Sequence, residues 1–165
     1  MNENNNQDLD TVKIEQGLIE DAEEILKLQK HAYISEAEIY NDYTIQPLTQ
    51  TLESIQADFK NQLFLKASIN GVIVGSVRGY IKDDTCHIGR LIVHPDYQNR
   101  GIGSRLMKEI EEYFNQAKRY VLFTGHRSER NLRLYHRLGY QPYQREVVSD
   151  SLTIVYMEKV KKSIT

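Results

Sequence analysis

Apolar and polar positions follow two alternating periods along the chain, and the change of period predicts where helices give way to strands. A short apolar run at residues 12–14 predicts a first strand. Helical spacing then predicts a helix that begins at Asp21, where Glu24 completes a capping box, and a second helix over residues 52–59. The pattern between them, from residue 33 to residue 51, is irregular.

The middle of the chain changes to the period of a sheet. Three runs at residues 63–69, 72–81 and 86–93 predict an antiparallel meander, and Asn70-Gly71 is a strong hairpin signal between the first two. An amphipathic helix is expected from Ile102 onward, because apolar residues recur along one side of it.

The last third of the chain predicts a strand, a helix and two closing strands. Residues 120–124 are continuously apolar, which is typical of a strand buried on both faces. Ser128 is expected to cap a short helix that Gly139 terminates, and strands follow around residues 147–148 and 152–157. This order favours one α/β (α+β) domain, with a mixed, mainly antiparallel sheet of about seven strands flanked by about four helices.

Composition limits the classes of function. The chain has 165 residues and a formal net charge of −2, so a single domain over residues 11–160 is expected between short tails at 1–10 and 161–165. A near-neutral charge argues against a nucleic-acid partner, and no apolar run approaches the roughly 20 residues that span a membrane. The single cysteine, Cys86, and the absence of a signal-peptide pattern favour a cytoplasmic location. His31, His126 and His136 do not have the spacing to carboxylates that a metal site would require.

The most informative segment joins the third meander strand to the amphipathic helix. It runs from His94 to Ser104 and contains Gln98-x-x-Gly101-x-Gly103. Glycines at a strand-to-helix turn let the backbone approach a ligand, and the free N–H groups of a helix start attract phosphate. The dinucleotide fingerprint fails because Leu106 occupies the third glycine position, and no Gly-Lys-Ser/Thr follows for a P-loop.

Together with a second segment, Ser128 to Tyr135 closed by Leu138-Gly139-Tyr140, this loop resembles the GNAT superfamily of acetyl-CoA-dependent N-acyltransferases. The resemblance covers about residues 12–159 and implies the GNAT fold, in which the glycine-loop strand and the next strand splay apart to admit the pantetheine arm. The cofactor-binding residues that it implies are Leu91, Ile92, Val93, Gln98, Asn99, Arg100, Gly101, Ile102, Gly103, Ser104, Asn131 and Tyr135. Arg105 is a further candidate for phosphate contact.

The resemblance also implies a catalytic role for Tyr135, whose hydroxyl would protonate the departing thiolate. Packing in the core is the alternative, because Leu132 and Tyr135 share a helix face. Many family members carry a glutamate where this chain has Gly89, so the base that accepts the amine proton is left open among His87, Asp84, Glu36 and water. Strand alternation would place His87, Gly89 and Leu91 on one face.

The irregular segment 33–43 is the expected wall of the acceptor site. Its candidate substrate residues are Tyr33, Glu36 and Tyr40, which suit a cationic amine by charge and cation–π contact, although ordinary solvated loop residues are an equal alternative. Polyamines, amino acids, aminoglycosides and peptide N-termini all remain candidates. The resulting hypothesis is an N-acetyltransferase that transfers acetyl from acetyl-CoA to a small-molecule or peptide amine in a ternary complex, as a monomer or homodimer. The alternative is an acyl-CoA-binding module without turnover.

Overall fold

A computed structural model describes residues 11–162, and a seven-stranded sheet in the order β1-β2-β3-β4-β5-β7-β6 forms its centre. The strands are β1 (Lys13–Gln16), β2 (Leu63–Ile69), β3 (Val72–Lys82), β4 (Thr85–Val93), β5 (Arg119–Gly125), β6 (Gln141–Val147) and β7 (Thr153–Val160). Neighbouring strands are antiparallel except β4 and β5. This mixed, mainly antiparallel sheet confirms the predicted fold class.

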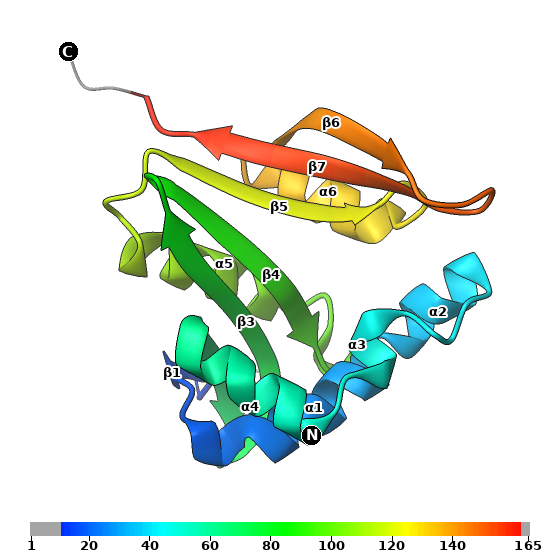
Figure 1. Cartoon of the computed structure of the whole chain (residues 1–165). Helices are drawn as coiled ribbons and strands as arrows, with labels where there is room; N and C mark the ends of the chain where they lie inside the picture. The colour runs from blue at the N-terminus through cyan, green and yellow to red at the C-terminus, as the bar shows by residue number, and fades with distance from the viewer. Residues whose placement is uncertain (1–10, 163–165) are drawn as a thin grey trace, which may run out of the picture.

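Helices cover both faces of the sheet (Figure 1). They are α1 (Ala22–Ala32), α2 (Ile34–Tyr40), α3 (Gln46–Thr49), α4 (Leu52–Asn61), α5 (Ile102–Tyr113) and α6 (Glu129–Arg137), with short 3₁₀ turns at Ile19–Asp21 and Pro95–Tyr97. Helices α1 and α4 pack on one face of β3 and β4, and α5 packs on the other face. Helix α6 lies behind β5 and β7, on the same side as α5.

Two apolar cores result from the alternation of side chains along the strands. Leu65, Ala67 and Ile69 face α5, whereas Phe64 faces α1 and α4. Such a two-sided core fixes the strand register, because a slip of one residue would turn each side chain to the wrong layer.

Two local predictions were wrong. The irregular segment 33–51 contains the short helices α2 and α3, so the described chain has six α-helices rather than about four. Asp21 and Glu24 form no capping box at α1: Asp21 accepts hydrogen bonds from Leu18 N and Lys66 Nζ, and Glu24 accepts one from Ile73 N. The preceding turn and the distant residues Lys66 and Ile73 therefore engage carboxylates that the local pattern assigned to the helix.

Strands β4 and β5 separate soon after they meet, as the resemblance implied. They pair only at Thr85–Arg119, Cys86–Tyr120 and His87–Val121. Beyond those pairs they diverge (Figure 1), although β4 continues to Val93 and β5 continues to Gly125. The backbone groups of residues 88–93 on this edge of β4 are thus not paired with β5.

A β-bulge in β4 lies where the strands diverge. Arg78 of β3 pairs with Gly89 and Ser76 pairs with Ile92, so Arg90 and Leu91 together oppose one residue of β3. Arg90 has a φ of 51°, in the left-handed region that costs a non-glycine residue free energy. The bulge reverses the alternation: Leu91 packs against the α5-side core, whereas Ile92 packs against the α1-side core. The prediction that His87 and Leu91 share a face was therefore wrong.

Candidate active site

The divergence of β4 and β5 opens a cleft of about 910 Å³. It is lined by most of the residues that the sequence nominated, namely Tyr33, Glu36, Tyr40, Leu91, Ile92, Val93, Gln98, Asn99, Gly101, Ile102, Gly103, Ser104, Asn131 and Tyr135. The lining does not include Arg100 or His87. Residues more than 90 positions apart thus meet in one cleft, whose volume is within the range of small-molecule sites.

The N-terminus of α5 contributes a cluster of free backbone donors to this cleft. Gly101 is the N-cap, with a φ of 83° and no side-chain capping bond. The N–H groups of the next three residues have no acceptor within the helix, and the first turn carries no acidic side chain. Together with the helix dipole, this geometry favours an anion.

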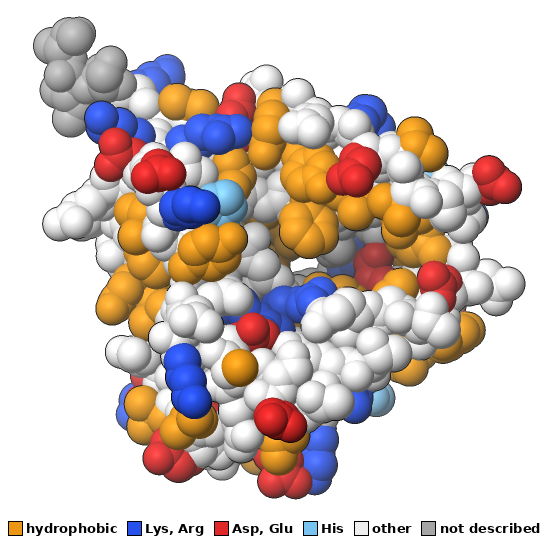
Figure 2. All heavy atoms as spheres, viewed as in Figure 1, with side chains coloured by type: hydrophobic (Ala, Val, Ile, Leu, Met, Phe, Trp, Pro, Cys, Tyr) orange, Lys and Arg blue, Asp and Glu red, His pale blue; other side chains and the backbone are white. Residues whose placement is uncertain are grey.

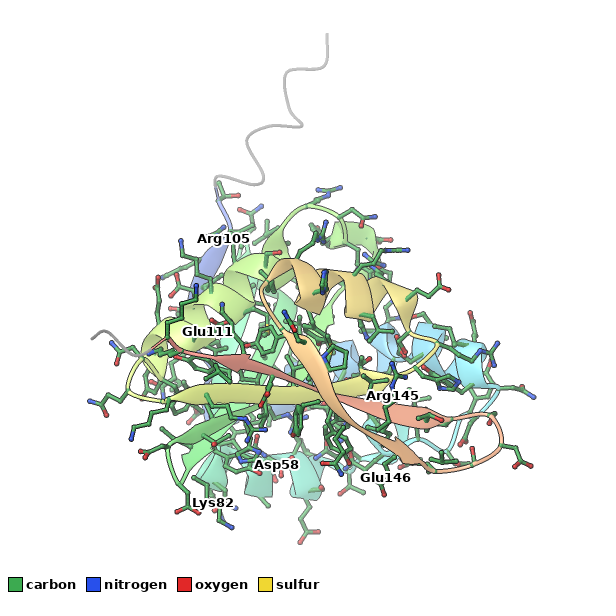
Figure 3. All side chains as sticks on the ribbon, turned by 90° about the horizontal axis from the view of Figure 1, so that it is seen from above. Asp58, Lys82, Arg105, Glu111, Arg145 and Glu146 are labelled. Carbon is green, nitrogen blue, oxygen red and sulfur yellow. The ribbon has the colours of Figure 1, made fainter. Side chains whose placement is uncertain are left out.

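Side chains around the glycine loop make different contacts from those expected. The guanidinium of Arg100 lies over the Tyr97 ring, with its carbon 5.3 Å from the ring centroid. Arg105 extends toward β1 (Figure 3), where its Nη2 donates to Val12 O at 3.4 Å. Gln98 donates to Val93 O at 3.1 Å and accepts a hydrogen bond from Arg130. Gln98 therefore joins the end of β4 to α6.

Tyr135 lies on α6 and reaches the cleft although the residue is only 7% exposed. Its ring meets Tyr140 edge-on, with centroids 6.1 Å apart. No hydrogen bond from its hydroxyl to another residue in the range 11–162 is present. Burial raises the pKa of Tyr135 well above its usual value, and the neighbouring Tyr33 and Glu36 raise it further. The phenol therefore stays protonated at neutral pH.

A hydrogen-bond cluster joins α2 to α6. Ser128 Oγ donates to Glu36 and is 2.8 Å from Tyr40 Oη, so the serine hydroxyl does not cap α6 as predicted. Asn131 Nδ2 donates to Glu36 Oε1 and Thr124 Oγ1, at 3.3 Å each. Tyr40 also accepts from Arg127 N at 3.0 Å, and it packs against the Cα of Gly125. Glu36 and Tyr40 thus fix one end of the cleft.

Comparisons with known proteins agree with this architecture. Residues 22–140 match the Acetyltransferase (GNAT) family. The chain belongs to this family.

Among curated relatives, the protein YqkA of Bacillus subtilis is 31% identical over 120 residues, which are 73% of this chain and 34% of that protein. The chain spans about a third of the length of the curated relatives that it matches. Among solved structures, the ribosomal-protein-S18-alanine N-acetyltransferase of Escherichia coli has a TM-score of 0.76 at 14% identity, covering 93% of this chain and 96% of that chain. The protein yncA of Salmonella typhimurium, solved with its cofactor acetyl-CoA, has a TM-score of 0.72 at 20% identity, covering 91% of this chain and 94% of that chain.

This GNAT protein has an open position at Gly89, where the sequence analysis noted the missing glutamate. A Cβ built on Gly89 meets no atom within 4 Å. Of the candidate bases, Asp84 lines neither this cleft nor the second cavity described next, and it forms an exposed ion pair with Lys118 at 3.5 Å. Glu36 lines the cleft, but both of its oxygens accept hydrogen bonds.

His87 lies in a second cavity of about 470 Å³ between β4, β5 and the helices α3 and α4. Its ring stacks on Tyr80 with centroids 4.8 Å apart. Burial lowers the pKa of His87, and the positive charges of Arg119 and Lys82 lower it further. The imidazole is therefore neutral at pH 7 and able to accept a proton.

Sequence reasoning missed three arginines of α6. Arg130, Arg133 and Arg137 line the cleft, as does the N-terminus of α5. Their spacing of three and four residues was the available signal, because such positions share a helix face. The prediction that residues 120–124 are buried on both faces was also wrong at Phe123, which is 58% exposed because β4 has diverged from β5.

Within the described residues, no helix is long and apolar enough to cross a membrane. Nor do three or more His, Cys, Asp or Glu side chains gather into a metal-binding group in the range 11–162.

Proposed function

We propose that this protein is an acetyltransferase that transfers an acetyl group from acetyl-CoA to an amine. One observation carries the proposal: a single cleft joins the uncapped N-terminus of α5, the unpaired edge of β4 and the buried hydroxyl of Tyr135. An anion site, an extended backbone edge and a proton donor are the three features that this reaction requires.

The residues present fit acetyl-CoA. The N–H groups at Ile102, Gly103 and Ser104 would hold the diphosphate, with Arg130 and Arg133 supplying charge. Leu91 and Val93 would pair with the pantetheine amides, as an added strand pairs with a sheet edge. When bound, acetyl-CoA supplies an activated acyl group on a thiol leaving group.

The residues of the chain then serve the transfer. A backbone N–H of β4 near the bulge polarises the acyl carbonyl, and the neutral amine attacks it directly. Tyr135 donates its proton to the sulfur as negative charge develops there. Burial disfavours the phenolate, but it disfavours a thiolate in the same place too, so both pKa values rise together and proton transfer remains feasible.

The amine must lose a proton before or during the attack. His87 is the neutral base nearest the point where β4 and β5 part, and we assign it this role, directly or through water. The identity of the base matters, because a binding module without turnover would also lack a carboxylate at the position of Gly89.

Calorimetric titration with acetyl-CoA, followed by an amine panel with detection of free thiol, tests the proposal. Saturable binding together with thiol release from one class of amine is the expected result. Binding without thiol release from any amine would favour the alternative, an acyl-CoA sensor. Absence of binding to any acyl-CoA would overturn both.

A further inference from the structure

The second cavity meets the acetyl-CoA cleft at the point where the strands part. Tyr33, Ile88, Gly89, Arg90, Leu122 and Phe123 line both spaces. Figure 2 views this side of the molecule and shows a hollow between the helices and the β5–β7 part of the sheet, with Lys or Arg side chains along it. A molecule in the second cavity would therefore reach the scissile bond from the face opposite α5 and α6.

Two arginines and one carboxylate set the charge of this cavity. Arg78 and Arg90 are its cationic lining residues, and Asp58 is its one acidic lining residue. Asp58 accepts from Arg78 Nη1 at 2.6 Å and from Gln50 at 2.7 Å, so its charge is already engaged. One positive charge remains without a carboxylate partner, and the cavity favours an anionic group.

Arg78 is a buried cation held in place by the helices. Its side chain is 4% exposed, and its Nη2 donates to Gln29 Oε1 at 2.6 Å. Within residues 11–162, its Nε is the buried side-chain nitrogen that lacks a hydrogen-bond partner. Burial and the neighbouring Arg90 lower the pKa of Arg78 to about 10, and Asp58 offsets them in part. Arg78 therefore remains charged at pH 7, and its Nε lacks a hydrogen-bond partner among the described residues.

Arg90 is the accessible cation of the pair. The bulge in β4 places it between Gly89 and Leu91, with its guanidinium carbon 5.9 Å from the centroid of the Tyr33 ring. It makes no ion pair with any residue in the described range. A left-handed φ of 51° at a bulge beside a cleft is a strained arrangement of the kind that re-aims a side chain for function.

The opposite wall of the cavity is aromatic. Phe123, Tyr143 and Tyr156 line it, and the Phe123 and Tyr143 side chains are exposed although they are large. The Phe123 and Tyr156 rings lie 5.8 Å apart, and the Tyr143 and Tyr156 rings lie 6.3 Å apart. Such a wall suits a flat or bulky apolar group.

We infer that the acceptor is a free α-amino acid with an aromatic or large apolar side chain, whose carboxylate binds Arg90. This inference rests on the proposed function of the same site. Arg90 lies in the bulge beside the strand edge where the acyl group is proposed to bind, and it lines both spaces. A carboxylate on Arg90 therefore suits an acceptor whose amine and carboxylate share one α-carbon. The N–C bond forms as the thioester C–S bond breaks. The amine nitrogen loses one proton, and the departing sulfur takes up one proton and leaves as the thiol.

The test compares phenylalanine, phenylalaninamide and phenethylamine as acceptors for the wild-type protein and for Arg90→Gln. In the wild type, kcat/KM for phenylalanine should exceed that for phenylalaninamide at least tenfold, because only the former carries a carboxylate. Arg90→Gln should remove that preference by lowering kcat/KM for phenylalanine to the value for phenylalaninamide. Arg145→Gln on β6, which lines neither cavity, is the matched control and should retain the preference (Figure 3).

Two results would overturn the inference: equal use of the amide and the amino acid, or a preference that survives in Arg90→Gln. Calorimetric binding of N-acetylphenylalanine to the CoA-saturated protein separates the two proposals. If this ligand binds and Arg90→Gln abolishes its binding, the carboxylate site stands even when no amine is acetylated and the enzymatic proposal fails. If amines are acetylated but N-acetylphenylalanine does not bind, the carboxylate site fails alone.

Discussion

The two halves of the sheet face the cleft with different kinds of groups. Strands β1–β4 and helix α5 present mainly backbone: the unpaired edge of β4 and the uncapped start of α5. Strands β5–β7–β6 and helix α6 present side chains, among them Tyr135, Asn131 and Arg130. We expect the first half to bind acetyl-CoA through its chain conformation, whereas its side chains His87 and Arg90 serve the second cavity. We expect the second half to depend on particular functional groups.

Removing the Tyr135 hydroxyl should have the largest effect. Tyr135→Phe takes away the proposed proton donor and no other described hydrogen bond, so kcat should fall about 100-fold with acetyl-CoA affinity retained. Steady-state kinetics and calorimetry measure the two quantities. Tyr140→Phe is the control, because it removes a bond to Glu111 at 3.0 Å outside the cleft and should lower stability without lowering kcat. Equal kcat in Tyr135→Phe and wild type would show that Tyr135 only packs.

Replacement of His87 tests where the amine proton goes. Because its pKa is lowered, the neutral form should persist below the ordinary value near 6.5, so kcat/KM should be flat above that pH and fall as the pH drops further. His87→Gln should reduce kcat/KM about tenfold at pH 7 and abolish the acidic limb. His31→Gln, an exposed residue stacked on His94, should keep the limb. An unchanged limb in His87→Gln would assign the base elsewhere.

Backbone geometry in the first half can be tested with a matched pair of glycines. Gly101 and Gly71 have φ of 83° and 80°, and a Cβ at either position meets no atom within 4 Å. An alanine in the left-handed region should lower the free energy of unfolding by about 1 kcal/mol at both sites. Only Gly101→Ala should weaken acetyl-CoA binding, by about fivefold, through a distorted helix start. Denaturant unfolding and calorimetry separate the two effects, and equal binding losses would refute the assignment.

The smallest effect is expected for a side chain of the first half. Arg100→Ala leaves the backbone donors in place and removes a guanidinium that lies over Tyr97 outside the cleft. Acetyl-CoA affinity should change by less than about twofold, because an exposed charge contributes little. A tenfold loss would show that the glycine loop also binds acetyl-CoA through side chains.

The sequence alone determined the strands, four of the six α-helices in the described chain and the glycine turn at the start of α5. The sheet and the glycine loop depend on local rules, because periodicity, hairpin signals and glycines at a helix start act within a few residues. Both motifs lay in the expected order, and the cleft that they form contains nearly all the residues that the sequence nominated.

The tertiary structure alone decided which side chains share a cavity and which distant residues form hydrogen bonds. The bulge at Arg90 reversed the strand alternation, so His87 lies in the second cavity while Leu91 packs toward α5. The Ser128 hydroxyl does not cap α6 and instead forms hydrogen bonds with Glu36 and Tyr40, which are more than 80 residues away. Hydrogen bonds and charge contacts between distant segments depend on where the strands of the sheet diverge. Such a divergence does not change the alternation of apolar and polar residues in either strand, so the sequence pattern does not reveal it.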